Sequence, residues 1–250
     1  MNALIFAAGL GTRLKPLTDT MPKAMVPVGG KPLVQLLIEK LKQSGAEQVV
    51  INVHHFARQI RDFVAKHDGF GLDIRFSDET DLLLETGGGL KKAAGLFTND
   101  APILVHNVDI LSDVDLAEFY GSVLKTDGQP TTLLVSERKT QRYLLADDAG
   151  RLVGWTNIAT GQVKTPYEKL DLAACRKVAF AGIQVFNPRM LPLMESWTGR
   201  FSIIDFYLDV CNKADIRLRL QPGLRLLDVG KLDSIAEAEM FLKTSQPQTS

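Results

Sequence analysis

The sequence predicts an α/β fold in which a mostly parallel sheet is flanked by helices. Short, almost wholly apolar runs alternate along the chain with amphipathic stretches of helical spacing. With 250 residues, 45% of them hydrophobic, the chain can bury a core as one large domain carrying a substantial insertion. We therefore expect a single domain over residues 1–243, followed by a frayed polar tail at residues 244–250.

Each element follows from its local pattern. Apolar runs predict strands at residues 3–8, 48–53, 72–77, 101–109, 131–137 and 178–186. Leu33, Leu37 and Leu41 keep helical spacing before Gly45, which predicts the first helix and its end. Similar patterns predict helices at residues 57–67, 86–97 and 232–243. Two short strands around residues 148–150 predict a hairpin, so residues 138–178 are interpreted as an insertion beyond the sheet.

Charge and cysteine content disfavour several classes of protein. Lys plus Arg and Asp plus Glu both number 29, so we expect no general attraction to nucleic acid or to an anionic membrane. Cys175 and Cys211 form no Cys-x-x-Cys pair, which is typical of a reducing cytoplasm rather than of a disulfide framework or a zinc site. No run reaches the ~18 apolar residues of a membrane span. We expect a cytoplasmic protein that binds anions only locally.

The loop after the first strand is suited to a phosphate. Gly9-Leu10-Gly11-Thr12-Arg13 follows a buried apolar run, and a glycine turn there exposes backbone N–H groups. Leu14 stands where a dinucleotide-binding turn needs a small residue, and no Gly-Lys-Ser/Thr closes a P-loop. The loop continues through several prolines and Lys23, at the edge where open α/β sheets bind ligands.

The segment AAGLGTRLKPLTDTMPKAMVPVGGKPL, residues 7–33, resembles the signature of the sugar-phosphate nucleotidyltransferases. The resemblance continues through LLLETGGGLKKA, NVDIL and LLDVGK, and it is greatest to short members such as N-acetylmuramate 1-phosphate uridylyltransferase and mannose or heptose 1-phosphate guanylyltransferases. It implies a Rossmann-like mixed sheet with a β-hairpin insertion on the sugar side. It also implies transfer of a nucleoside monophosphate from a nucleoside triphosphate to a sugar 1-phosphate, with release of pyrophosphate.

Both reactants are anions, so positive charge is the main requirement of the site. The resemblance makes Arg13 and Lys23 the catalytic cations, with Lys23 nearest the α-phosphate; we expect Lys23 to face solvent when no ligand is bound. Glycines opening a helix, as after Glu85, are hard to explain unless another group approaches the backbone closely. The expected nucleotide-binding residues are Ala7, Ala8, Gly9, Gly11, Thr12, Arg13, Lys23, Glu85, Thr86, Gly87 and Gly88.

A divalent metal is expected to supply part of this positive charge. Asp109 and Asp228 each follow an apolar run, so both are predicted to end strands at the carboxyl edge of one sheet. Carboxylate oxygens that leave positions for phosphate and water suit Mg²⁺. The resemblance implies the same pair of ligands.

The acceptor side departs from the family pattern. Many relatives carry Glu-Lys-Pro after the hairpin, where this chain has Val153-Gly154-Trp155-Thr156-Asn157; Lys164 is one substitute for the missing lysine. The residues expected to bind the sugar phosphate are Asn107, Arg142, Tyr143, Trp155, Asn157 and Gly182. Two other functions stay open: a cytidylyltransferase acting on a non-sugar phosphate such as phosphocholine, and a catalytically silent regulator that binds nucleotide sugars.

Overall fold

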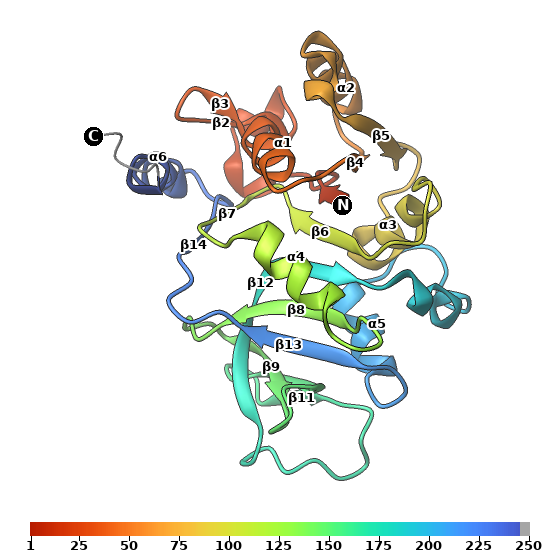
Figure 1. Cartoon of the computed structure of the whole chain (residues 1–250). Coiled ribbons are helices and arrows are strands. Elements are labelled where there is room, and N and C mark those ends of the chain that lie inside the picture. Colours follow the sequence, from red (N-terminus) through yellow and green to blue (C-terminus); the bar gives the residue numbers. More distant parts are fainter. Residues whose placement is uncertain (246–250) are drawn as a thin grey trace.

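A ten-stranded mixed sheet forms the centre of the fold in the computed structural model, which describes residues 1–245 (Figure 1). Its main path runs β11-β10-β9-β12-β6-β1-β4-β5, with β8 beside β12 and β13 beside β8. The strands on this path that were predicted from the sequence are β1 (Asn2–Phe6), β4 (Gln48–Val53), β5 (Asp73–Asp78), β6 (Ile103–Asn107), β9 (Arg142–Ala146), β10 (Leu152–Asn157) and β12 (Arg176–Phe186). Beside it lie β8 (Thr131–Ser136), which was predicted, and β13 (Ile216–Leu220), which was not.

The parallel part of the sheet is built around β1. This strand pairs in parallel with β4 on one side and β6 on the other, and Phe6 stands level with both Asn52 and Asn107. The interior of all three strands is buried, which explains their continuous apolar runs. Their carboxyl ends therefore meet at one edge of the sheet.

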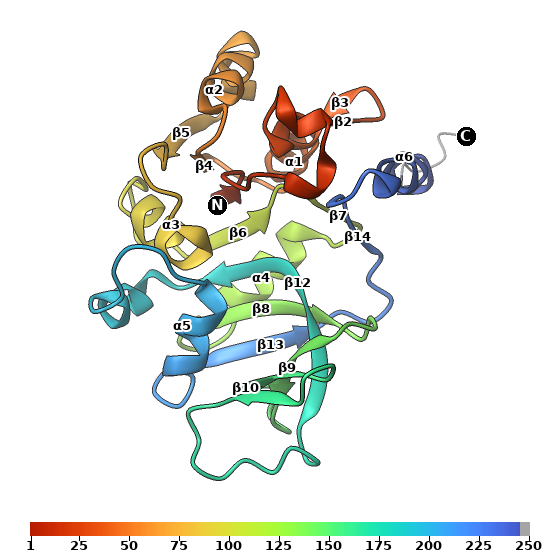
Figure 2. The ribbon, with the colours of Figure 1, turned by 180° about the vertical axis from the view of Figure 1, so that it is seen from behind.

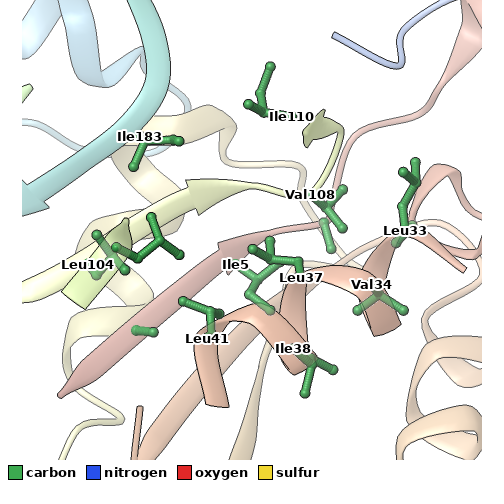
Figure 3. Packing of buried hydrophobic residues seen from close by; sticks show 14 of the residues in the cluster. Ile5, Leu33, Val34, Leu37, Ile38, Leu41, Leu104, Val108, Ile110 and Ile183 are labelled. Carbon is green, nitrogen blue, oxygen red and sulfur yellow. The ribbon is translucent and has the colours of Figure 1, made fainter. Parts of the chain in front are cut away.

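Helices cover both faces of the sheet. They are α1 (Leu33–Gln43), α2 (Ala57–Lys66), α3 (Glu85–Ala94), α4 (Leu116–Leu124), α5 (Ile203–Val210) and α6 (Asp233–Ser245). On one face α1 presents Leu37 and Leu41 to the side of β1 that carries Ile5 (Figure 3). On the other face α3 and α5 pack in the cluster that contains Leu4 (Figure 2). Within residues 1–245, no helix has the length and apolar character needed to cross a bilayer.

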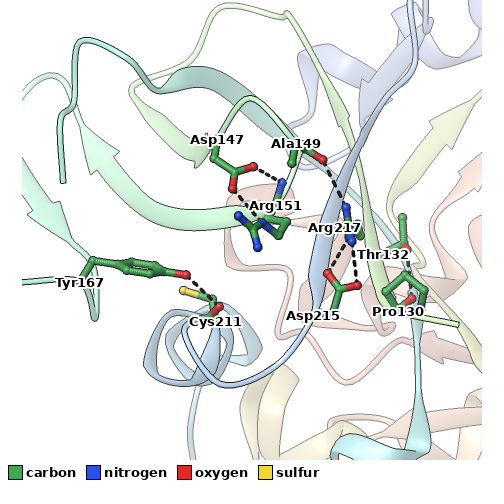
Figure 4. Close-up of polar contacts among 9 residues, drawn as sticks. All are labelled: Pro130, Thr132, Asp147, Ala149, Arg151, Tyr167, Cys211, Asp215 and Arg217. Carbon is green, nitrogen blue, oxygen red and sulfur yellow. Dashed lines mark hydrogen bonds and ion pairs between the residues drawn. The ribbon is translucent and has the colours of Figure 1, made fainter. Parts of the chain in front are cut away.

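The insertion forms a small antiparallel sheet that shares one long strand with the main sheet. β12 pairs with β9 at its start, with β8 from Ala179 onward and with β6 through its last four residues; its pairing with β8 shifts between Phe180 and Gln184. The predicted hairpin is confirmed as β9 and β10, to which β11 (Gln162–Lys164) adds a strand that was not predicted. At the hairpin turn, Arg217 of β13 donates to the carbonyl of Ala149 (3.3 Å; Figure 4).

Two features of the C-terminal part of the chain differ from expectation. Asp228 does not end a strand of the main sheet: it lies on β14 (Leu226–Asp228), which pairs with β7 (Ile110–Ser112) in a separate two-stranded ribbon. α6 continues to Ser245, two residues beyond the predicted end of the last helix at residue 243. The frayed tail itself falls on residues 246–250, which lie outside the described part of the chain.

Candidate active site

A cavity of about 350 Å³ opens at the carboxyl edge of β1, β4 and β6. Its wall consists of Phe6, Ala7, Ala8, Gly9, Lys23, Asn52, Glu79, Leu83, Glu85, Thr86, Asn107, Val108, Asp109 and Ser202. Of the expected nucleotide-binding residues, the wall lacks Gly11, Thr12, Arg13, Gly87 and Gly88. The cavity thus joins the loop after β1, the start of α3 and the end of β6, three segments that are far apart in sequence.

The two glycines of the opening loop have different reasons to be glycine. Gly9 is exposed and lines the cavity, and a Cβ there would meet no atom within 4 Å, so the space over its backbone is open to a ligand. Gly11 has φ +63°, and a Cβ there would lie 2.9 Å from the Thr18 methyl group. Gly11 is therefore required by the turn itself, whereas Gly9 is the one suited to phosphate.

Lys23 lies in a short 3₁₀ turn, Lys23–Met25, and its ammonium group is paired with the Asp109 carboxylate. The lysine is only 9% exposed. The expectation that Lys23 faces solvent is therefore wrong. The reason is that the carboxylate of Asp109, in the turn after β6, lies within reach and attracts the ammonium group into the cavity wall.

The β7–β14 ribbon brings the two predicted metal ligands together. Asp228 pairs with Ile110 in the ribbon, and the N–H of Val229 donates to the Asp109 carbonyl (2.8 Å). A Cβ added at Gly230 would lie 2.6 Å from an Asp228 carboxylate oxygen and 2.8 Å from an Arg13 guanidinium nitrogen. Arg13, although exposed and outside the cavity wall, is thus beside Asp228.

This donor set fits a hard divalent cation. Asp109, in the turn between β6 and β7, and Asp228, at the end of β14, offer carboxylate oxygens, and the Lys23 ammonium already occupies the place of a cation at Asp109. Over residues 1–245, no group of three or more His, Cys, Asp or Glu side chains is placed to hold a metal. A metal held by these two aspartates would therefore need further oxygen ligands from phosphate and water.

Asn52 and Glu79 belong to the site but were not predicted from the sequence. Asn52 Oδ1 accepts from the N–H groups of Ala7 (2.6 Å) and Ala8 (3.1 Å), and its Nδ2 donates to Glu79 Oε1 (2.9 Å). The available signal was a lone amide near the end of an otherwise apolar strand, QVVINV. In a strand buried on both faces, such a residue must find polar partners.

The glycines of α3 accommodate the protein's own chain. A Cβ at Gly87 would lie 2.3 Å from the Phe201 ring, and one at Gly88 would lie 2.4 Å from the Gly199 carbonyl oxygen. The expectation of a close approach to this backbone is confirmed, but the approaching group is the segment that leads into α5. The residues facing the cavity are Glu85 and Thr86.

Glu85 and Thr86 are fixed by the same segment. Glu85 adopts φ +59° and is paired with Arg200 (2.8 Å) at the surface. Thr86 Oγ1 accepts from the N–H of Ile203, the first residue of α5 (3.0 Å). The start of α5 therefore sets the position of this side of the cavity.

Among the expected acceptor residues, Asn107 alone lines the cavity. Gly182 is beside it: its φ is +74°, and a Cβ there would lie 3.0 Å from Asn107 Nδ2. Arg142, Tyr143, Trp155 and Asn157 lie on β9 and β10, outside the cavity wall. Lys164 is 5.5 Å from the centroid of the Trp155 ring and is paired with Asp205 of α5 (2.7 Å).

A larger hollow of about 1110 Å³ lies between α1, β7 and α6. It shares Val108 with the first cavity but contains none of the residues expected to bind nucleotide, sugar phosphate or metal.

Comparison with known proteins agrees with the geometry. The family model described as nucleotidyl transferase matches residues 2–245. The N-acetylmuramate alpha-1-phosphate uridylyltransferase of Neisseria meningitidis is 44% identical over 115 residues, which is 46% of this chain and 49% of that protein. The mannose-1-phosphate guanyltransferase of Yarrowia lipolytica is 30% identical over 203 residues, covering 78% of this chain and 52% of that protein.

A solved structure described as a putative glucose-1-phosphate thymidylyltransferase from Bacillus anthracis has the same fold, with a TM-score of 0.79 at 16% identity. It covers 96% of this chain and is itself covered to 94%. By sequence, the chain spans about half the length of the curated relatives it matches.

Proposed function

The chain belongs to the nucleotidyl transferase family, and we propose that it transfers a nucleoside monophosphate from a nucleoside triphosphate to a sugar 1-phosphate. The observation that carries this proposal is the single cavity in which Gly9, Lys23 and Asp109 meet at the carboxyl edge of the sheet. An open glycine backbone, a cation and a carboxylate at one edge suit a triphosphate and its metal. We place the reaction in the cytoplasm, where nucleoside triphosphates are made.

In the proposed reaction an oxygen of the sugar phosphate attacks the α-phosphorus. The bond from that phosphorus to the bridging oxygen breaks, and pyrophosphate leaves with the electron pair. Lys23 and Arg13 offset the repulsion between the two anions, and Gly9 offers a backbone donor. Asp109 and Asp228 would hold Mg²⁺, which when bound neutralises charge on the phosphates.

The base would lie over Ala7 and Ala8, between them and the start of α3. Glu85 lines this space, and a carboxylate accepts hydrogen bonds and donates none. Uracil and guanine both present a ring N–H, whereas cytosine and adenine present acceptors at the corresponding ring position. We therefore propose uridylyl transfer, with guanylyl transfer as the alternative, and both activities appear in the names of relatives.

The acceptor would enter between Asn107, Gly182 and the strands of the insertion. Asn107 is the only expected acceptor residue in the cavity wall, and Gly182 keeps the space beside it free of a side chain. Arg142, Tyr143, Trp155 and Asn157 would contact the sugar from β9 and β10.

The test is a panel of the four nucleoside triphosphates against several sugar 1-phosphates and phosphocholine, with pyrophosphate release measured with and without Mg²⁺. We expect release with UTP or GTP, a sugar 1-phosphate and Mg²⁺ together. Turnover confined to CTP and phosphocholine would replace the proposal with the cytidylyltransferase. Nucleotide-sugar binding without turnover of any pair would instead favour a regulator.

A further inference from the structure

We infer that Asn52 and Glu79 form a positioning pair that holds the two nucleotide-binding segments at a fixed separation. This inference rests on the proposed function, because it assigns these segments to the nucleotide. One segment is the backbone at Ala7 and Ala8, and the other begins α3 after Leu84. Neither residue of the pair takes part in a chemical step. Both act through the backbone groups that they hold.

The pair links the segments through a continuous chain of hydrogen bonds. Asn52 Oδ1 accepts from the N–H groups of Ala7 and Ala8, and Asn52 Nδ2 donates to Glu79 Oε1 at 2.9 Å. The other carboxylate oxygen, Glu79 Oε2, accepts from the N–H of Leu84 at 2.9 Å. Leu84 is the N-cap residue of α3, so the chain of bonds runs from the floor of the cavity to the start of the helix.

Only a carboxylate satisfies both donors that face Glu79. Asn52 Nδ2 and the Leu84 N–H each present a hydrogen, and each meets a different oxygen. An ionised carboxylate accepts at both oxygens, whereas an amide would turn a donor toward one of these hydrogens. Glu79 therefore also fixes the amide of Asn52, because it requires Nδ2 to point toward the carboxylate and Oδ1 toward the loop.

Burial makes this arrangement costly unless every bond is formed. Glu79 is 1% exposed and Asn52 is 3% exposed. Within residues 1–245 no Lys, Arg or His forms an ion pair with the Glu79 carboxylate; His54 Nδ1 lies 2.7 Å from its backbone carbonyl. A buried charge without a cation is stabilised only by its hydrogen bonds, so the pair tolerates little displacement.

The third glycine of α3 leaves room for the pair. A Cβ at Gly89 would lie 2.7 Å from Glu79 Oε1 and 3.1 Å from Asn52 Nδ2. Gly89 is thus the contact through which α3 packs directly on the pair. Asn52, Glu79 and Gly89 therefore set the distance between the two parts of the cavity wall, at Ala7 and at the start of α3.

The hydrogen-bond pattern can be exchanged between the two residues. Glu79→Gln alone turns an amide donor toward either Asn52 or Leu84, and Asn52→Asp alone sets two carboxylates against each other. In the double variant the carboxylate at position 52 accepts from the N–H groups of Ala7 and Ala8 and from the amide at position 79. The oxygen of that amide accepts from the N–H of Leu84. Charge and hydrogen-bond count are both restored.

The opposite ends of β4 and β5 offer a control of the same chemistry, in which Asp73 is exposed and also pairs with Arg75. Gln48 Nε2 donates to Asp73 at 2.5 Å, and Gln48 Oε1 accepts from the N–H of Thr98 at 2.9 Å. Gln48 is 5% exposed. Gln48→Glu and Asp73→Asn, singly and together, repeat the exchange of chemistry without touching the cavity.

The experiment measures KM for each substrate, kcat, nucleotide Kd and thermal unfolding for both sets of variants. Amide hydrogen exchange at Ala7, Ala8 and Leu84 is measured without ligand. We expect Glu79→Gln and Asn52→Asp to raise the KM and Kd of the nucleotide about tenfold or more, the loss typical of an unsatisfied buried polar group. The KM of the sugar phosphate should change far less, and the double variant should recover most of the nucleotide affinity and the exchange protection.

Three outcomes would overturn the inference. Equal nucleotide affinity in the single variants and the wild type would show that the pair only supports the fold. A double variant no better than the singles would mean that the Glu79 carboxylate itself contacts the nucleotide. Nucleotide-specific losses in the Gln48 and Asp73 variants would show a general effect of these strands.

Two arms keep the test decisive. If the Asn52→Asp single variant does not fold, the nucleotide affinities of Glu79→Gln and of the double variant still show whether the exchange restores the pair. If the wild type turns over no substrate pair, the proposed function fails while the exchange measurement still tests the pair.

Discussion

The Lys23 ammonium is paired with the Asp109 carboxylate, and their side chains are only 11% and 19% exposed. One residue was expected to contact phosphate and the other a metal. The ion pair therefore joins the residues of the two proposed functions. We expect binding of substrate and metal to separate this pair, because Lys23 would then face a phosphate and Asp109 a metal.

Lys23→Ala should lower turnover on the order of a hundredfold, about 3 kcal/mol of lost transition-state stabilisation. It should also raise the affinity of the free protein for Mn²⁺, because Asp109 then has no competing ammonium group. Steady-state kinetics and calorimetric titration with Mn²⁺ measure the two effects. Lys15→Ala is the control, because Lys15 is exposed and paired with Asp19 rather than with Asp109 or Asp228. Weaker Mn²⁺ binding in the Lys23 variant would contradict the competition.

Asp109→Asn and Asp228→Asn should each reduce activity and weaken its dependence on Mg²⁺. The ribbon register brings the two residues together, so we expect one ion to be held by both. Once either ligand is lost, removing the second should cost little more, and the double variant should lose much less than the sum of the single losses. Additive losses in the double variant would assign the two aspartates to separate roles.

The sequence predicted the elements whose local pattern is unambiguous. The strand at residues 48–53 and the hairpin around residues 148–150 are found where expected, because a continuous apolar run and a turn with Asp and Gly are local signals. β13 and α5 were not predicted. The alternating Ile-Arg-Leu-Arg-Leu of β13 is the pattern of a half-buried strand, so this signal was present in the sequence. α5 has only eight residues and gives a weak helical pattern.

The parts of the site that could not be predicted depend on contacts between distant segments. The sequence around Lys23 predicts a solvent-facing loop cation, because its neighbours do not reveal the carboxylate 86 positions away. The glycines at positions 87 and 88 did indicate a close approach, but only the structure identifies Phe201 and Gly199 as the approaching groups. Glu79 looked like an ordinary residue after a strand, although it is 1% exposed.

Gly88→Ala should destabilise the protein and weaken nucleotide binding together. The new methyl group would lie 2.4 Å from the Gly199 carbonyl oxygen, so the start of α3 or the segment before α5 must move. Overpacking of this kind costs about 1–3 kcal/mol. Chemical denaturation and nucleotide titration measure the two effects. Gly95→Ala, at the end of the same helix, is the control, because its nearest atom would be 3.8 Å away. Unchanged stability in Gly88→Ala would contradict this view of the glycine.

His106 should make the fold sensitive to acid. Burial lowers the pKa of its imidazole to about 4, and Nε2 has no hydrogen-bond partner among the described residues. Between pH 6.5 and 4 the unfolded chain therefore binds a proton that the folded protein does not. The free energy of unfolding should fall as the pH falls through this window, by up to roughly 3 kcal/mol from this group.

The measurement is urea denaturation of the wild type and of His106→Leu from pH 7 to pH 4. The difference between the two proteins isolates the histidine from the other titrating groups. We expect the wild type to lose more stability than the variant over this range. Parallel pH profiles would show that His106 becomes protonated without unfolding the chain.

Trp155→Ala should raise the KM of the sugar phosphate more than that of the nucleotide. Trp155 is half-buried on β10, with Lys164 5.5 Å from its ring centroid, so an apolar ring and a cation lie side by side on the insertion. This combination suits a sugar face and a phosphate, whereas the residues proposed for the nucleotide come from other strands and helices. Trp155→Phe keeps an aromatic face and should retain most of the sugar-phosphate affinity, which separates stacking from loss of packing. Both KM values are measured well below the unfolding temperature of each variant. An effect confined to the nucleotide would mean that the insertion contacts the base, and the acceptor pocket would then have to be sought on the Asn107 side of the cavity alone.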